Sequence, residues 1–335
     1  MGSSPGQSGV DLWALTDLCT PWCVHVVATL RIAHHVEAGI SDIAGLAEAS
    51  GCDRDALHSV LGHLVGKGVF EEPAPGTLAL NEAARGLLDP GARLGLDLDG
   101  IGGRMAHAWG TLLTYVRTGK PAYYEVFGRP FWEDLEAHPE MAAEFDALIG
   151  PPGHGTPNPH FEITGGWDSV KTVVDVGGGT GAMLAAILHA RPGIRGILVD
   201  QPGTVARSVE IFRDVAERVT TVGQSFFDPL PPGGDLYLLK GILNDWPDPD
   251  ATAILLRCAE AAGQKGRVVV LGGLAPDNSP QTLMIEAVLL GGKQRTVAEM
   301  AALARQVGLE VITAGRQSSG HFVVEFRPRG DSEIL

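Results

Sequence analysis

The stretch Thr172-Val-Val-Asp-Val-Gly-Gly-Gly-Thr-Gly-Ala-Met183 decides the fold of this chain. A short run rich in valine leads directly into a glycine cluster, and an apolar segment of helical periodicity follows at 182–190. Glycine permits the tight turn, and its missing side chain lets the backbone lie close to a ligand. The stretch therefore predicts a strand, a ligand-binding loop and a helix of a doubly wound α/β domain.

Strand and helix patterns alternate from this point to the end of the chain. The predicted strands are 172–176, 196–200, 219–222, 235–239, 267–271, 309–313 and 321–326. The predicted helices are 182–190, 204–214, 250–262, 282–290 and 297–306. This alternation is typical of a parallel sheet with helices on both faces. The last two strands have no helix between them, which predicts an antiparallel final strand.

Three regions are expected along the chain. Residues 1–92 are helical at first, over 11–35, and then carry two short helices and a hairpin, which predicts a winged-helix domain for dimerisation. Residues 93–160 are expected to form a helical linker and substrate lid that ends in the Pro- and Gly-rich loop 150–159. Residues 161–335 form the predicted α/β domain.

A winged helix also suggests a DNA-binding regulator, but the charges disfavour it. The winged-helix segment 41–85 holds seven acidic and three basic residues, and the whole chain has a formal charge of −15. Nucleic acid is therefore not an expected partner. No apolar stretch near the N-terminus is long enough to span a membrane, so a cytoplasmic location is expected. Cys19 and Cys23 lie one helical turn apart and are interpreted as packing residues, and no metal is expected.

The ligand of the glycine loop is interpreted as S-adenosylmethionine (SAM). The pattern Gly177-x-Gly179-x-x-Ala182 also fits a variant dinucleotide fingerprint. Three details favour SAM: Asp175 can accept from the cofactor's ammonium group, the loop follows an all-helical region, and the chain ends in a strand pair of the methyltransferase kind. Asp200 ends the second strand, where a carboxylate can bind both ribose hydroxyls.

Two further strand ends supply candidate contacts. Ser225 and Phe226 follow the third strand and offer a polar group and an aromatic face for adenine. Lys240 closes the fourth strand at the ligand crevice. The predicted cofactor contacts are Asp175, Gly177, Gly179, Asp200, Gln201, Ser225, Phe226, Lys240 and Trp246.

The chain resembles the small-molecule O-methyltransferase family, which includes plant caffeate-type enzymes and bacterial polyketide and antibiotic methyltransferases. The segments that carry the resemblance are 117–123, 128–135, 173–181, 226–231, 238–246 and 291–296. The resemblance implies a class I Rossmann-like methyltransferase domain, a homodimer formed through the N-terminal domain, and methylation of an aromatic or polyketide-like small molecule with S-adenosylhomocysteine as the second product.

The family's catalytic residues do not carry over. Asn244 stands where the family commonly has its histidine base, in the triplet Asn244-Asp245-Trp246, and an amide cannot serve as that base. Gly272 and Gln294 stand where the family has glutamates. One interpretation is a substrate acidic enough to ionise unaided. The other is a fold-sharing enzyme that binds SAM without consuming it, for hydroxylation, decarboxylation or a pericyclic or cyclisation step.

Glu286 is the remaining candidate for the lost base. The run 282–290 is apolar except at Glu286, where the family normally places a methionine that lines the substrate pocket. A carboxylate in such surroundings must be paired or have a raised pKa. It is expected either to act on the substrate as an acid, a base or the partner of an amine, or to pair with Lys293 or Arg295. The candidate catalytic residues are Asn244, Asp245, Glu286 and Gln294, and the candidate substrate contacts are Trp109, Phe131, Trp132 and Glu286.

Overall fold

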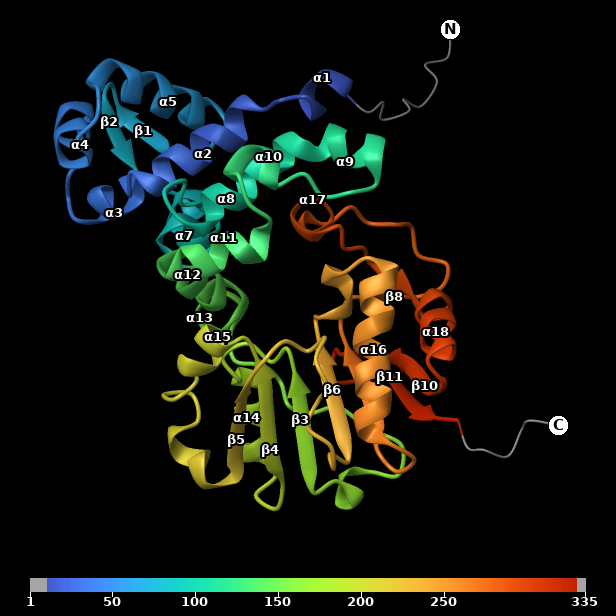
Figure 1. The fold of residues 1–335 in the computed structure, drawn as a ribbon. Coiled ribbons are helices and arrows are strands. Elements are labelled where there is room, and N and C mark those ends of the chain that lie inside the picture. The colour runs from blue at the N-terminus through green and yellow to red at the C-terminus, as the bar shows by residue number, and fades with distance from the viewer. Residues whose placement is uncertain (1–10, 330–335) are drawn as a thin grey trace, which may run out of the picture. The chain divides into compact units, whose positions relative to one another are not determined.

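The computed structural model describes residues 11–329, which form two compact units divided between Arg104 and Met105 (Figure 1). One buried core lies in the N-terminal unit, and two lie in the larger second unit.

The N-terminal unit is a set of short helices followed by a hairpin. Its elements are α1 (Leu12–Leu15), α2 (Cys19–Thr29), α3 (Ile32–Glu37), α4 (Ile43–Ser50), α5 (Arg54–Gly66), β1 (Glu71–Ala74), β2 (Thr77–Ala79), α6 (Glu82–Arg85), η1 (Gly86–Leu88) and α7 (Pro90–Leu96). The strands pair antiparallel, as expected for the wing. Asp53 caps α5 by accepting from the Ala56 amide at 2.8 Å.

The region of helical periodicity over 11–35 is divided into three helices, α1, α2 and α3. Arg31 between α2 and α3 has φ of 55°, a left-handed conformation that no α-helix continues through. The division lets α2 pack on α5 while α3 packs on α4, so that Val27, Ile32 and Leu61 share one core.

Short helices also make up the start of the second unit. They are α8 (Ile101–Ala108), which crosses the boundary, η2 (Trp109–Thr111), α9 (Leu112–Thr118), α10 (Tyr124–Phe127), α11 (Phe131–Ala137), α12 (Pro139–Ile149), α13 (Pro151–His154) and η3 (Trp167–Ser169). The expectation that 150–159 contains no helix was wrong for α13. Both prolines lie at the start of this single turn, where their missing N–H groups cost no helical hydrogen bond.

A seven-stranded sheet forms the centre of the second unit, in the order β10-β11-β7-β6-β3-β4-β5. Its strands are β3 (Thr172–Val176), β4 (Arg195–Asp200), β5 (Val219–Gly223), β6 (Leu236–Lys240), β7 (Arg267–Leu271), β10 (Leu309–Arg316) and β11 (Phe322–Pro328). The first five run parallel, whereas β11 pairs antiparallel with both β7 and β10. The expected antiparallel last strand is confirmed.

The remaining elements connect these strands. They are α14 (Ala182–Ala190), α15 (Pro202–Ala206), η4 (Arg213–Arg218), η5 (Leu243–Asp245), α16 (Asp248–Ala262), β8 (Leu274–Ala275), α17 (Ile285–Leu290), β9 (Arg295–Thr296) and α18 (Val297–Gln306). The helix predicted over 204–214 was wrong, because α15 ends at Ala206. The Ser208 hydroxyl donates to the Val205 carbonyl at 2.7 Å, a local bond that competes with a continuing helix.

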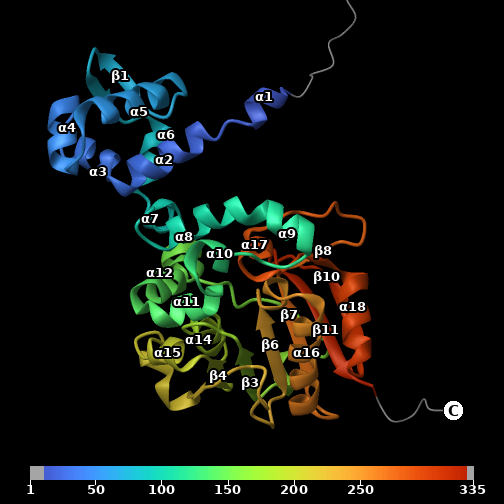
Figure 2. The same cartoon turned by 45° about the horizontal axis from the view of Figure 1, so that its top comes forward.

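Alternate side chains of the strands fill two cores. Val174, Tyr237 and Val268 pack on one face with α16 and α18. Val173 and Leu236, one residue before Val174 and Tyr237, pack on the other face with α14. Figures 1 and 2 show α10 to α13 and α17 grouped at the end of the sheet where the parallel strands finish.

Candidate functional site

The carboxyl ends of four parallel strands bring the predicted cofactor residues to one edge of the sheet. The strands β3, β4, β5 and β6 end at Val176, Asp200, Gly223 and Lys240. They are hydrogen-bonded neighbours in the order β6-β3-β4-β5, so the loops that follow them lie side by side. This edge is the candidate cofactor site.

The glycine loop is shaped by its immediate neighbours. Gly181 has φ of 88°, and a Cβ added there would lie 2.1 Å from the ring of Phe212. A Cβ on Gly178 would lie 2.5 Å from Oδ2 of Asp175. Both positions therefore require glycine, and the backbone at these positions is left uncovered by side chains of its own.

Asp175 is buried beneath this loop with only 1% of its surface exposed. Its Oδ2 has no hydrogen-bond partner among the described residues. Burial raises the pKa of the carboxyl to about 7, although the nearby charge of Lys240 opposes the rise. A buried acceptor without a donor fits the ammonium group of SAM, directly or through a water.

Asp200 ends β4 with both carboxylate oxygens facing the loop backbone. Oδ2 accepts from the Gly179 amide at 2.8 Å, and Oδ1 accepts from the Gln201 amide at 2.7 Å. Burial raises its pKa to about 6. Each oxygen has capacity for a second hydrogen bond, so the side chain remains able to hold ribose hydroxyls.

Aromatic rings gather where adenine was expected. The centroids of Phe226 and Trp246 are 5.8 Å apart, and Phe227 lies 5.0 Å from Trp246. The Ser225 hydroxyl accepts from the Phe227 amide at 3.2 Å, which fixes the turn that presents these rings. Phe226 also approaches the loop closely, because a Cβ on Gly177 would lie 3.2 Å from its ring.

Phe131 and Trp132, the two predicted aromatic contacts on α11, have different surroundings. Phe131 is 1% exposed and packs edge-on against Tyr123, Trp132 and Phe145. It is a core residue, which differs from the expectation that it faces the ligand. Trp132 is half-buried, and its buried Nε1 has no acceptor within residues 11–329, so it remains a candidate contact.

An ion pair joins these helices to the cofactor edge. Asp146 of α12 binds Arg207, which directly follows α15, with a separation of 2.6 Å between Oδ2 and Nε. The charge of Asp146 contributes to the raised pKa of Asp200. The helices therefore lie near the ribose-binding candidate.

A buried arginine fixes the loop that carries the altered catalytic triplet. Arg295 is 1% exposed and donates to the carbonyls of Leu243 and Trp246 and to the carboxylate of Asp248. Asn244 is 8% exposed, and its Nδ2 donates to Oδ1 of Asp245 at 2.9 Å. The amide is thus held in place as a hydrogen-bond donor.

Asp245 and Glu286 lie on two packed elements, η5 and α17, and interact through their charges. Burial raises the pKa of Asp245 to about 8, and the negative charge of Glu286 adds to the rise. Burial therefore favours the protonated form of Asp245 at neutral pH. Oε2 of Glu286 is buried and has no hydrogen-bond partner among residues 11–329.

The alternative in which Glu286 pairs with Lys293 or Arg295 was wrong. Both cations bind Asp248 instead, at 3.0 and 2.8 Å. Gln294 lies between them and is half-buried. Trp109 is 39% exposed on η2, which packs against α17, so it lies on an element next to Glu286.

Sequence reasoning missed Phe212, Asp248 and Arg295. Phe212 lay within a predicted helix, where an apolar residue carries no sign of contact with a glycine. The Asp248 pairing joins residues far apart in sequence. The Gly-Gly-Lys-Gln-Arg-Thr segment was identified only by resemblance.

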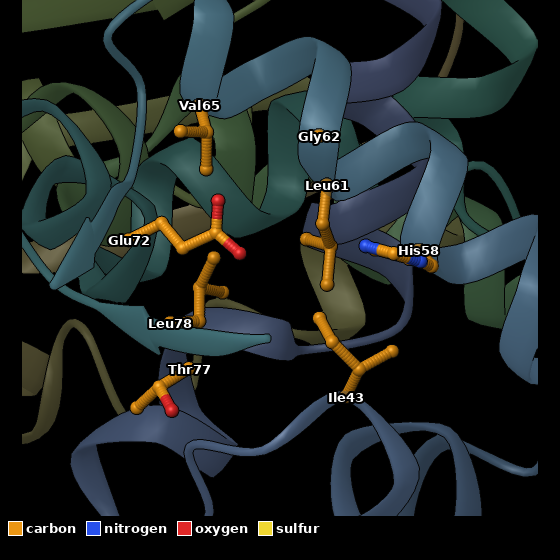
Figure 3. A pocket seen from close by; sticks show the side chains of 8 residues that line it. All are labelled: Ile43, His58, Leu61, Gly62, Val65, Glu72, Thr77 and Leu78. Carbon is orange, nitrogen blue, oxygen red and sulfur yellow. The ribbon is translucent and has the colours of Figure 1, made fainter. Parts of the chain in front are cut away.

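A small hollow in the N-terminal unit does not compete as a ligand site. Its volume is about 20 Å³, room for roughly one water. Figure 3 shows the Glu72 carboxylate near Val65 and Leu78 in this hollow, and Glu72 already accepts from the Gly76 amide at 2.6 Å.

Comparison with known proteins decides the family. The O-methyltransferase domain family matches residues 109–310. The chain belongs to the O-methyltransferase family. It is 40% identical over 319 residues to 2,7-dihydroxy-5-methyl-1-naphthoate 7-O-methyltransferase of Streptomyces carzinostaticus. The aligned region covers 91% of this chain and 94% of that protein.

Two further relatives bear on the chemistry of this methyltransferase. A crystal structure of an O-methyltransferase from neocarzinostatin biosynthesis, with SAM and 2-hydroxy-5-methyl naphthoic acid, has a TM-score of 0.88 at 37% identity and covers 96% of this chain and 100% of the other. Aclacinomycin 10-hydroxylase RdmB of Streptomyces purpurascens is 37% identical, covering 97% of this chain and 92% of that protein. The cofactor of this methyltransferase is SAM. Among residues 11–329, no helix is long and apolar enough to cross a membrane.

We expect Asp175→Asn to stabilise the SAM-free methyltransferase and to weaken SAM binding. The folded state holds the Asp175 proton up to pH about 7, whereas the unfolded state loses it near the ordinary aspartate pKa of 3.8, so ionisation costs stability as pH rises between these values. At about 1.4 kcal/mol per pH unit, the variant should gain roughly 2–4 kcal/mol at pH 8 and less than about 1 kcal/mol at pH 4. Urea denaturation across this pH range measures the gain.

Calorimetric titration with SAM measures the second effect. Replacing the charged acceptor by an amide should weaken binding by about 10- to 100-fold. Asp168→Asn, at an exposed aspartate, is the matched control and should change neither quantity. Unchanged SAM affinity in Asp175→Asn would contradict the ammonium assignment.

Proposed function

We propose that this enzyme transfers the methyl group of SAM to a hydroxyl group of an aromatic, polyketide-type small molecule. The observation that carries the proposal is the buried Oδ2 of Asp175, an acceptor without a donor among the described residues, beneath a loop in which Gly178 and Gly181 have no room for a side chain. The substrates named for the relatives, a naphthoate above all, support an aromatic acceptor. The proposed cofactor contacts are Asp175, Gly177, Gly179, Asp200, Gln201, Ser225, Phe226, Lys240 and Trp246.

Bound SAM supplies an activated methyl group. The protein's part is to orient the acceptor hydroxyl in line with that group and to exclude water. We assign the first task to the elements that surround η5, where Arg295 immobilises the loop with Asn244 and Asp245. Trp109, Trp132 and Gln294 are the proposed neighbours of the substrate.

Glu286 is proposed to receive the proton of the acceptor hydroxyl. Its Oε2 is buried without a partner among the described residues, and the neighbouring Asp245 keeps its own proton at neutral pH. A protonated Asp245 does not repel the carboxylate of Glu286. The substrate group that faces Glu286 is then a hydrogen-bond donor, a hydroxyl or an amine, because a carboxylate there would meet a like charge.

A second function is favoured by one relative. RdmB is named as a hydroxylase at 37% identity, and Asn244 removes the usual base in this chain. A SAM-binding enzyme that leaves SAM unchanged is therefore the competing candidate. A winged-helix regulator is not proposed, since the family comparison identifies an enzyme.

Mass spectrometry separates the two enzyme functions. The full chain is incubated with SAM and a panel of hydroxynaphthalenes, hydroxynaphthoates and anthracyclines. We expect S-adenosylhomocysteine and a product heavier by one methylene, in equal amounts. Product formation with SAM intact would contradict methyl transfer and would support the enzyme that binds SAM without consuming it.

The role of Glu286 predicts a loss of turnover in Glu286→Gln. We expect kcat/KM to fall by about 10- to 100-fold with SAM affinity unchanged, because a hydrogen bond to a charged group is removed from the substrate alone. Removing the charge of Glu286 should also lower the pKa of Asp245 from about 8, shifting any activity limb near that pH downward.

The control for this variant is Glu310→Gln, at an exposed glutamate of β10. It should leave kcat/KM and the pH profile unchanged. If Glu286→Gln matches the wild type in turnover and in substrate affinity, Glu286 has no role in the reaction.

We further propose a cytoplasmic homodimer. All four cysteines are free, which suits a reducing compartment. The N-terminal unit exposes large apolar side chains on and beside α1 and α2, with exposures of 66% for Leu12, 82% for Trp13, 72% for Leu15, 74% for Leu18 and 36% for Trp22. A contiguous set of this kind is typical of a protein interface.

Sedimentation equilibrium tests the homodimer. The wild type should have twice the chain mass of 35.2 kDa, and Leu18→Lys should shift the equilibrium to one chain. Leu113→Lys, at a leucine of α9 that is 59% exposed, should leave the dimer intact. A monomeric wild type would rule out the proposal.

A further inference from the structure

Two cysteines and a histidine come together between α2 and α5 in the N-terminal unit, which holds none of the residues assigned to methyl transfer. Sγ of Cys19 and Sγ of Cys23 are 3.8 Å apart. A ring nitrogen of His63 and the two sulfurs all lie within 4.8 Å of one another. Cys23 is buried, His63 is half-buried and Cys19 is exposed, so the cluster reaches from the core of the unit to its surface.

The sulfur spacing matches a tetrahedral zinc site. With Zn–S bonds of about 2.3 Å, two sulfurs at the tetrahedral angle are about 3.8 Å apart. The thiols therefore need no rearrangement of α2 to bind one ion. The spacing of Cys19 and Cys23 alone indicates packing residues, because it does not reveal a histidine on another helix.

Hydrogen bonds around His63 set its tautomer. The Thr20 hydroxyl has one proton and donates it to Oδ2 of Asp17 at 2.6 Å, because a carboxylate can only accept. Its oxygen must then accept from Nε2 of His63, which lies 2.8 Å away. Nδ1 of the neutral ring is left with a free lone pair. Outer partners of this kind, a carboxylate acting through a hydroxyl, orient histidines that bind metals.

The surrounding charges favour a cation. Burial raises the pKa of the Cys23 thiol, and Cys19 and Asp17 add to the rise. A divalent ion bound between the sulfurs would offset these effects, since it stabilises thiolates and neutralises their mutual repulsion. Lys67 pairs with the same Asp17 at 2.9 Å.

We propose that Cys19, Cys23 and His63 bind one Zn²⁺ ion, with water in the fourth position. Binding forms two Zn–S bonds and one Zn–N bond and releases the two thiol protons to solvent, with no change of oxidation state. The ion joins α2 to α5 and thereby stabilises the N-terminal unit. The site is independent of the methyltransferase reaction.

Metal titration of the reduced, metal-free full chain tests the proposal. We expect one Zn²⁺ per chain, and Co²⁺ in the same site should give thiolate-to-cobalt charge-transfer absorption with the strong visible bands of tetrahedral geometry. Cys19→Ser, Cys23→Ser and His63→Gln should each weaken binding by at least about tenfold. Cys52→Ser and Cys258→Ser, at the other two free cysteines, should bind as the wild type does.

Thermal unfolding provides a second measurement. Zn²⁺ should raise the Tm of the wild type and of Cys52→Ser but not that of His63→Gln, whose fold in the absence of metal is checked by circular dichroism. The proposal is overturned if the reduced chain binds no zinc, if His63→Gln binds it with unchanged affinity, or if the cobalt spectrum lacks the thiolate band.

Discussion

The burial of the Asp175 carboxyl is the constraint on which the cofactor edge depends. A carboxylate excluded from water is unfavourable unless its charge or its hydrogen bonds are compensated, and burial here raises the pKa to about 7. The neighbouring Gly178 can carry no side chain, because its Cβ would meet that carboxyl at 2.5 Å. Lys240 reaches the same region from the end of the adjacent strand and partly offsets the cost. One buried acid thus explains three features: the glycine beside it, the adjacent position of β6, and the cation that β6 brings near.

The sequence predicted the α/β domain well where short-range chemistry decides structure. The strands Thr172–Val176 and Arg267–Leu271 and the helix Ala182–Ala190 have the predicted limits, because their apolar periodicity ends at glycine or charged residues. The helix Val297–Gln306 also has its predicted limits, and a capping box of Thr296 and Glu299 fixes its start. The helix over 204–214 failed because the Ser208 hydroxyl bonds to the chain itself, a preference that periodicity does not register. Helix α17 begins at Ile285 rather than at 282.

Site residues divide in the same way. Asp175 and Asp200 follow from position alone, since residues at the carboxyl ends of parallel strands meet at one edge. The pairing of Asp245 with Glu286 could not be read from the sequence, because packing of α17 on η5 brings them together. The partner of Arg295 could not be read from the sequence either. It is Asp248, although Glu286 is nearer to Arg295 along the chain. Competition among several charges for one cation is decided by three-dimensional geometry.

Unsatisfied polar atoms connect the cofactor edge to the substrate side. Buried polar groups in proteins nearly always have partners. Three buried atoms at this site have no partner within the described residues. They are Oδ2 of Asp175 on β3, Oε2 of Glu286 on α17 and Nε1 of Trp132 on α11. Two are acceptors and one is a donor, so ligands that complete them must present a cation or donor to each acid and an acceptor to the indole. An aminoacyl cofactor and a hydroxylated aromatic molecule together offer these groups, whereas a purely apolar ligand would leave every one of them unpaired. The loss of the histidine base has thus not made this site apolar: its polarity resides in carboxyl groups whose charges depend on burial and on each other.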